Sequence, residues 1–234
     1  MNAMSQAVPR LELLSVHVPK CGGSSLLTAL ARVFPGDELL LDYDDRPGDP
    51  ASPVNLDPPG FYERAHAALP LVLRGRRAVH GHFHPRKYQP ANAGFRTAII
   101  REPLARLLSH YHFWRRLSPG PHQLHRYFLE QNLDLEGFAR LPFIRHFYTR
   151  VFFGGVDFAD FDYIGTLETM PATAAAIGRG IGRLLDIGVE NKADASDYPE
   201  AAREIEGDSS LRQRLAGLLA DDIRFYENVR ARWS

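Results

Sequence analysis

Residues 16–25 read V-H-V-P-K-C-G-G-S-S. The apolar run at residues 11–18 is typical of a buried strand, and residues 26–33 are typical of a helix. Gly22 and Gly23 allow backbone amides to approach a ligand closely, and the amino terminus of a helix attracts anions. The stretch therefore predicts a strand–loop–helix unit whose loop binds phosphate or a similar oxyanion.

The loop differs from nucleoside-triphosphate loops in the order of its residues. Those loops place lysine after the second glycine, whereas Lys20 precedes both glycines here. Glycine and a helix-capping serine also occur at ordinary strand-to-helix connections, so the loop alone leaves a purely structural role open. Assigning a binding function to this loop therefore requires a second motif elsewhere in the sequence.

A second strand–turn–helix pattern covers residues 95–111. Residues 95–100 are typical of a strand, and Pro103 suits the first turn of a helix, so Arg101 is predicted at the carboxyl end of the strand. One face of the following helix has core-facing spacing and comprises Leu104, Leu107, Leu108 and Tyr111. Another face has the same spacing and comprises Arg106, Ser109, His110 and Phe113. Ser109 is therefore predicted to face the ligand crevice together with Arg101.

A histidine-rich segment at residues 78–84 lies between these elements. Residues 78–80 are apolar enough to end a buried strand, and Gly81 lets the chain turn toward the crevice. His82 is the predicted general base, because an imidazole pKa near about 6.5 suits proton removal at neutral pH. Alternating histidines can also bind metals, but no cysteine pair or spaced carboxylates accompany them, so no metal is expected. His80 is interpreted as a hydrogen-bonded core residue or a second site histidine.

Other histidines have simpler interpretations. His84 precedes Pro85, which indicates a loop. His122 and His125 follow a Ser-Pro-Gly-Pro turn and are expected on the solvated surface. His110, beside Ser109, is the one best placed to approach a ligand.

The two strand–loop–helix elements resemble the signatures of the carbohydrate-type (type 2 domain) sulfotransferases. That family has an H-I-P-K-T-G-G-T-S loop followed by an R-[E/D]-P-x-x-R-x-x-S-x-Y element, and both are matched here in that order. Gly81 and His82 also resemble a G-H segment whose histidine is the base in heparan 2-O-sulfotransferase-like members. The resemblance implies a three-layer α/β fold like that of P-loop kinases, with a mostly parallel central sheet flanked by helices.

The resemblance also implies the reaction and its residues. The chain would transfer a sulfuryl group from 3′-phosphoadenosine 5′-phosphosulfate to an acceptor hydroxyl, on a carbohydrate, without a metal. Arg101 and Ser109 would hold the 3′-phosphate, His82 would accept the hydroxyl proton, and Lys20 would stabilise the leaving oxygen. The first loop would hold the 5′ end of the donor through Lys20, Cys21, Gly22, Gly23, Ser24 and Ser25. Cysteine stands at position 21 where threonine is commoner, so that side chain lacks the hydroxyl.

Two other classes of function stay open. A nucleotide-dependent phosphoryl transferase would need the triphosphate lysine order and an acidic Mg²⁺-binding strand end, neither of which is evident. The other class is a nucleotide- or carbohydrate-binding module that keeps the fold without catalysis. The presence of Lys20, His82, Arg101 and Ser109 together argues against such a loss and favours an enzyme.

Composition sets the broader expectations. The 234 residues, 44% of them hydrophobic, predict one α/β domain, and the resemblance implies that it is a sulfotransferase-like domain over 1–234. The proline-rich composition of 42–60 predicts an irregular loop, either a cap over the site or an excursion from the core. Basic and acidic residues both number 28, so nucleic acid is not an expected partner. The oligomeric state stays open.

Cysteine content and hydropathy predict a location. Cys21 is the single cysteine, so an intrachain disulfide is impossible and a reducing, cytoplasmic compartment is expected. A neighbouring cation that lowered its pKa would make this thiol sensitive to oxidation. No apolar run reaches the roughly 18 residues of a membrane span.

The remaining regular elements are predicted from periodicity and proline positions. They are a helix at 61–69, a mainly helical stretch at 124–150 interrupted at Pro142, a strand at 161–165, a helix at 177–187 and an amphipathic helix at 211–233.

Overall fold

The computed structural model describes residues 8–187, 205 and 207–233, and the structural statements below concern these residues. Its centre is a five-stranded sheet in the order β2-β3-β1-β4-β5. All neighbouring strands pair in parallel. The strands are β1 (Leu11–His17), β2 (Leu39–Asp42), β3 (Ala78–Gly81), β4 (Ala93–Ile100) and β5 (Tyr163–Thr166). The predicted α/β fold with a mostly parallel sheet flanked by helices is confirmed.

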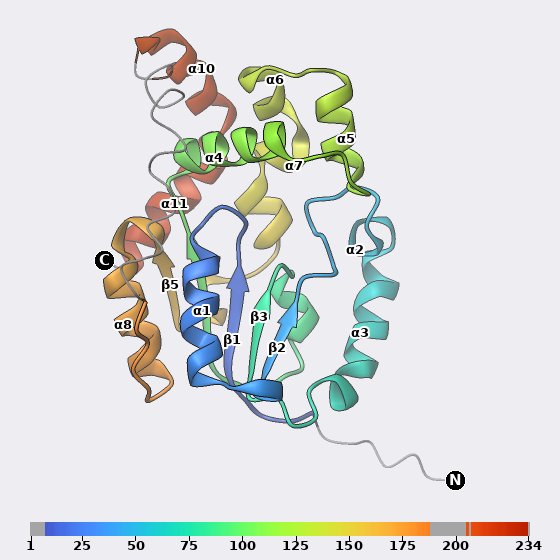
Figure 1. The fold of residues 1–234 in the computed structure, drawn as a ribbon, viewed down its shortest axis with the longest axis vertical. Coiled ribbons are helices and arrows are strands. Elements are labelled where there is room, and N and C mark those ends of the chain that lie inside the picture. Colours follow the sequence, from blue (N-terminus) through green and yellow to red (C-terminus); the bar gives the residue numbers. More distant parts are fainter. Residues whose placement is uncertain (1–7, 188–204, 206, 234) are drawn as a thin grey trace.

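Helices flank the sheet and also lie across the ends to which the strand arrows point (Figure 1). The helices are α1 (Gly23–Val33), α2 (Pro53–Leu56), α3 (Pro58–Val72), α4 (Pro103–Arg116), α5 (Gln123–Glu130), α6 (Leu135–Arg140), α7 (Pro142–Arg145), α8 (Met170–Gly180), α10 (Ser209–Leu218) and α11 (Ala220–Trp233). Shorter helical turns are η1 (Gly36–Glu38), η2 (Pro85–Tyr88), η3 (Phe147–Phe152), η4 (Phe158–Asp160) and η5 (Leu167–Thr169). In Figure 1, α4, α5 and α6 form the layer above the strand ends. None of the helices in the described part of the chain is long and apolar enough to cross a membrane.

The order of the strands places three loops side by side. β1 lies between β3 and β4, with Val16 opposite Gly81 and His17 opposite Ile99. The chain forms β2 and β3 on one side of β1 and then crosses to form β4 and β5 on the other. Ligands of parallel α/β sheets bind at such reversals, at the carboxyl ends of the strands. The loop after β1 and the segments after β3 and β4 therefore meet at one edge.

Two apolar clusters stabilise this arrangement. One surrounds the sheet and includes Leu13, Val79 and Ile100. The other joins α4 to α5 and α6 through residues such as Leu107, Phe128 and Phe138. The predicted core face of α4 is thus confirmed, and the second cluster holds this helix across the strand ends.

The prediction of an irregular segment at 42–60 is wrong at both ends. Asp42 is the last residue of β2, α2 occupies Pro53–Leu56, and α3 begins at Pro58, where Asp57 caps it by accepting from Gly60 N–H. Lys87 Nζ lies 2.7 Å from both Asp42 Oδ2 and Asp45 Oδ1. Polar composition suggested an excursion, but buried ion pairing ties the segment to the core.

Other element boundaries also differ from the predictions. α3 extends beyond the expected 61–69, and α8 ends at Gly180 instead of occupying 177–187, since Pro171 favours an earlier start and Gly182 has a φ of 65°. The expected single helix at 211–233 is two helices, because α10 packs on α6 whereas α11 packs on β5 and η3. The short edge strand β2 was not predicted; it forms by pairing with β3.

Candidate functional site

The loop after β1 leads directly into α1, which begins at Gly23, earlier than expected. Ser24 and Ser25 therefore belong to the first helical turn. The N-cap residue of this helix is Gly22, which has no side chain to cap the helix start. Since the first N–H groups of a helix have no partner inside the helix, α1 presents a site suited to an anion.

The glycine pair has a packing role as well as a backbone role. Gly22 has a φ of 80°, and a Cβ added there would lie 2.5 Å from Leu167 Cδ1. A Cβ on Gly23 would lie 1.9 Å from the imidazole of His17. The second glycine is thus required because the His17 ring lies against the start of α1.

Lys20 has a backbone conformation that is unusual for a residue with a side chain. Its φ is 67°, in the left-handed region, which costs of order 1–2 kcal/mol. Its Nζ lies 4.2 Å from the centre of the Phe113 ring of α4. The strained backbone directs the ammonium across the site toward the helical layer.

Cys21 faces the opposite way. Its side chain is buried, with Sγ 3.5 Å from the Tyr148 hydroxyl. Burial raises the pKa of the thiol to about 12, so the condition for sensitivity to oxidation, a lowered thiol pKa, is not met. Any part that Cys21 plays in donor binding would fall to its backbone.

His82 follows β3 directly and lies in a cluster of rings. Its centroid is 4.5 Å from that of His17 and 4.6 Å from that of Tyr43. Its Nε2 is buried and has no hydrogen-bond partner among the described residues. Burial lowers the pKa of His82 to about 4, so the ring is neutral at pH 7 and offers an unprotonated nitrogen.

His17 and Tyr43 were not predicted as site residues. His17 Nδ1 and the Tyr43 hydroxyl are hydrogen-bonded at 3.0 Å, and the His17 ring stacks on that of His80 at 5.1 Å. Burial, with the nearby His82, His80 and Lys20, lowers the pKa of His17 to about 2. The three residues come from the ends of β1, β2 and β3, and only the unpredicted β2 brings Tyr43 there.

The predictions for the other histidines are confirmed in some cases and wrong in others. His80 is a core residue, as interpreted, with Nδ1 hydrogen-bonded to Ser15 Oγ at 2.9 Å. His84 lies beyond β3, at the start of η2, as expected. The surface prediction is wrong for His125, which is buried with Nε2 bonded to the Trp114 carbonyl at 2.9 Å, because α5 packs against α4.

Arg101 lies immediately after β4, as predicted. The Tyr148 hydroxyl accepts from its N–H at 3.1 Å and donates to its carbonyl at 2.6 Å. Glu102 caps α4 by accepting from Ala105 N–H at 2.7 Å, while Glu168 Oε1 accepts from Glu102 N–H at 2.9 Å. The backbone of Arg101 and Glu102 is thereby tied to η3 and η5.

Ser109 and Arg106 belong to α4, and both are buried. The Arg106 guanidinium lies 4.1 Å from the centre of the Phe147 ring and donates to the Ile144 carbonyl at 3.3 Å. Arg106 therefore joins α4 to η3 and α7 from within.

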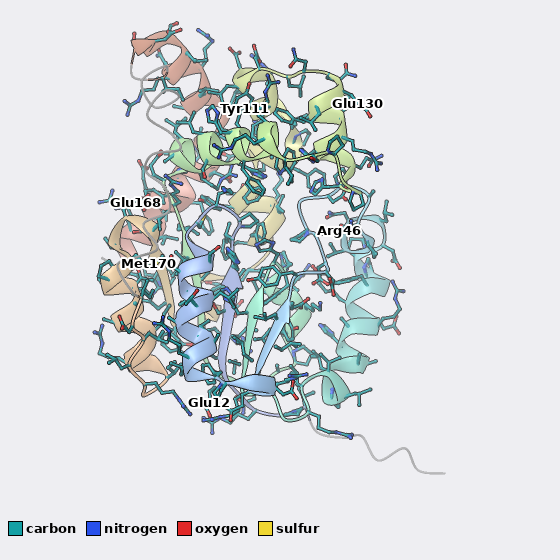
Figure 2. The ribbon with its side chains drawn as sticks, in the orientation of Figure 1. Glu12, Arg46, Tyr111, Glu130, Glu168 and Met170 are labelled. Carbon is teal, nitrogen blue, oxygen red and sulfur yellow. The ribbon has the colours of Figure 1, made fainter. Side chains whose placement is uncertain are left out.

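A cavity of about 170 Å³ opens beside Lys20 and His82. Its walls come from the loop after β1, the segments after β2 and β3, α4, the residue before α5, α7 and η3. The lining residues are Pro19, Lys20, Arg46, Pro47, Gly48, His82, His110, Phe113, Trp114, His122, Ile144, Phe147 and Phe152. In Figure 2, Arg46 lies on the segment between β2 and α2, below the helical layer. The polar side chains of this lining are lysine, arginine and histidine, with no carboxylate.

The ring cluster is not arranged as a metal site. His17 and His80 are stacked at an interplanar angle of 14°, so their rings lie face to face. In the part of the chain that the structure describes, no group of three or more His, Cys, Asp or Glu side chains has an arrangement that could hold a metal ion.

Comparisons with known proteins find similarity among solved structures. No protein-family model matches the chain, and no curated protein matches it significantly. The chain is similar to the crystal structure of a sulfotransferase from Alicyclobacillus acidocaldarius, with a TM-score of 0.40 and 16% sequence identity, over 91% of this chain and 97% of that chain. Similarity at this level does not identify a donor or an acceptor for this chain.

Proposed function

We propose that the chain is a sulfotransferase that moves a sulfuryl group from 3′-phosphoadenosine 5′-phosphosulfate to an acceptor hydroxyl. One observation carries the proposal: Lys20 and His82 line the same cavity at the edge where α1 begins. An ammonium and an unprotonated imidazole on one cavity suit a reaction that needs both charge stabilisation and proton removal. The order of the sequence motifs supports the same reaction.

The donor would lie along the loop after β1 and the start of α4. The backbone of Gly22 and Gly23 and the side chains of Ser24 and Ser25 would hold its 5′ end at the uncapped helix start. Arg101 and Ser109 would hold its 3′-phosphate. The pairing of β1 with β4 supports this arrangement, because the two segments leave adjacent strands at the same edge.

In the transfer step, the acceptor oxygen forms a bond to sulfur as the bond between sulfur and the bridging phosphate oxygen breaks. The phosphate keeps the bonding electrons, and Lys20 stabilises its developing charge. His82 accepts the hydroxyl proton. His17 and Tyr43 orient the His82 ring by packing against it.

Activity should depend on pH in a way that distinguishes buried His82 from an ordinary histidine. With a pKa of about 4, His82 stays neutral from pH 8 to 5.5, so kcat/KM should be nearly constant over that range. A base with a pKa of about 6.5 would lose about 90% of its neutral form at pH 5.5. His82→Ala should lower kcat by about 10²-fold or more at each pH. Initial rates measure the pH dependence of the parent chain and the loss in His82→Ala, and circular dichroism checks that the variant is folded. Unchanged turnover in His82→Ala would show that His82 is not the base.

Donor binding gives the direct test of the proposed function. Calorimetry should detect binding of 3′-phosphoadenosine 5′-phosphate, and Arg101→Ala should weaken it about 10–100-fold, as expected for loss of a charged hydrogen bond to phosphate. Arg224→Ala is the control, because Arg224 is exposed on α11 and pairs with Asp221. Binding of ATP with Mg²⁺, without binding of the bisphosphate, would instead indicate a phosphoryl transferase. Binding without transfer to any acceptor would indicate a module.

A further inference from the structure

The cavity beside Lys20 and His82 is small and has aromatic walls. Its volume of about 170 Å³ is close to the roughly 150 Å³ of a protein cavity known to hold benzene. Phe113, Trp114, Phe147 and Phe152 line it. The space between these walls therefore fits one planar ring, and its open side leaves room for a substituent on that ring.

Most polar side chains of the cavity can only donate hydrogen bonds. Lys20 and Arg46 have no acceptor atoms. His122 Nδ1 accepts from His125 N–H at 3.3 Å, and His110 Nδ1 lies 3.4 Å from Arg106 Nη1, which can only donate. Burial lowers the pKa of His110 and of His122, and each neutral ring then carries its proton on Nε2.

His82 is the exception, because its buried Nε2 is uncommitted. Among the described lining residues it is the side chain with a nitrogen left to accept a hydrogen bond, and a small rotation of the ring would expose this buried nitrogen to a ligand. A ligand with one O–H group and otherwise acceptor or anionic oxygens matches such walls. A sugar would bring several O–H donors without side-chain acceptors for them.

Arg46 is the second positively charged side chain of the cavity, besides Lys20. Its φ is 46°, so two of the three non-glycine residues with positive φ in the described chain, Lys20 and Arg46, line this cavity. The turn is held by Asp49 N–H, which donates to the Arg46 carbonyl at 2.9 Å. The guanidinium is 4.0 Å from Asp49, a long ion pair, and the side chain is 45% exposed. Strained residues of this kind concentrate at ligand sites.

We propose that the acceptor is a phenolic acid of one ring, with its hydroxyl at Lys20 and His82, its ring between the aromatic walls and its acid group on Arg46. This inference rests on the proposed sulfuryl transfer. The phenol oxygen bonds to sulfur, the bridging phosphate oxygen leaves with the bonding electrons, and the phenol proton passes to His82. A weakly basic imidazole deprotonates a phenol, with a pKa of about 10, more readily than an aliphatic alcohol. The structure thus favours a different acceptor from the carbohydrate that the family resemblance implies.

Acceptor binding to the full chain tests this inference by calorimetry, with and without 3′-phosphoadenosine 5′-phosphate. 4-Hydroxybenzoate should bind about tenfold or more tightly than its methyl ester, and glucose should show no binding. Arg46→Ala should weaken 4-hydroxybenzoate binding about tenfold. Arg64→Ala should leave it unchanged, because Arg64 is an exposed residue of α3 that pairs with Asp57.

The outcomes separate the acceptor from the reaction. Equal affinity for the acid and its ester, tighter binding of glucose, or no effect of Arg46→Ala would overturn the phenolic acid, whether or not the bisphosphate binds. Transfer of labelled sulfate to sugars but not to 4-hydroxybenzoate would also overturn it, while supporting sulfuryl transfer. Lack of both bisphosphate binding and transfer to any acceptor would count against the proposed function itself.

Discussion

Lys20→Ala is expected to slow sulfuryl transfer by about 10²–10³-fold, the usual effect of removing one group that stabilises developing negative charge. The ammonium lies on the cavity shared with His82, where a departing phosphate oxygen would gain charge. Single-turnover rates with saturating donor measure the chemical step directly. Turnover within threefold of that of the parent chain would show that Lys20 does not stabilise the leaving oxygen.

Lys20→Gly provides the matched control for the backbone. Glycine tolerates the φ of 67° that strains Lys20, so this variant should be about 1 kcal/mol more stable than Lys20→Ala, as measured by urea unfolding. Both variants lack the ammonium and should lose activity alike. Recovery of activity in the glycine variant would instead assign the effect to the shape of the loop.

Mild acid is expected to destabilise the fold strongly through its buried histidines. Burial lowers the pKa values to about 2 for His17, about 3 for His80, and about 4 for His82 and His84. The unfolded chain therefore binds more protons than the folded chain below about pH 6.5, so stability falls as pH falls through that value. Between pH 7 and 5.5 each histidine contributes a loss of about 1.3 kcal/mol.

One carboxyl group opposes this trend. Burial, with the adjacent Asp42, raises the pKa of Asp45 to about 6. Protonation of Asp45 in the folded state therefore stabilises the fold by about 1 kcal/mol as the pH falls from 7 to 5.5. The loss from these five groups together should be about 4 kcal/mol, a large part of the typical 5–15 kcal/mol stability of a protein. Urea unfolding at pH 7 and pH 5.5 measures it. His84→Gln should reduce the difference by about 1 kcal/mol, and equal stability at the two pH values would contradict the neutral buried histidines.

Local signals predicted the strand–loop–helix units well. The apolar run before Lys20 forms β1, and Pro103 begins α4 directly after the turn that carries Arg101 and Glu102. These features depend on neighbours in the chain: apolar runs, proline at helix starts and glycine at positive φ. Boundaries such as those of α8 and α10 depend on packing against distant elements, and their predictions were less accurate.

Contacts between residues that are far apart in the sequence could not be predicted from such local signals. Tyr43 reaches His17 because β2 pairs with β3, which in turn pairs with β1. Arg46 lines the cavity because buried Asp42 and Asp45 tie their segment to Lys87. Polar composition at 42–60 carries no sign of these contacts.

The sequence by itself determined the strand–loop–helix unit around Lys20 and the position of Arg101 between its strand and α4, since each follows from short-range pattern and backbone chemistry. The tertiary structure alone decided that Gly23 makes room for His17, that Cys21 is buried, and that a small aromatic cavity with donor walls adjoins His82. The physical reason is that burial, ring packing and pKa depend on which segments the sheet order brings together.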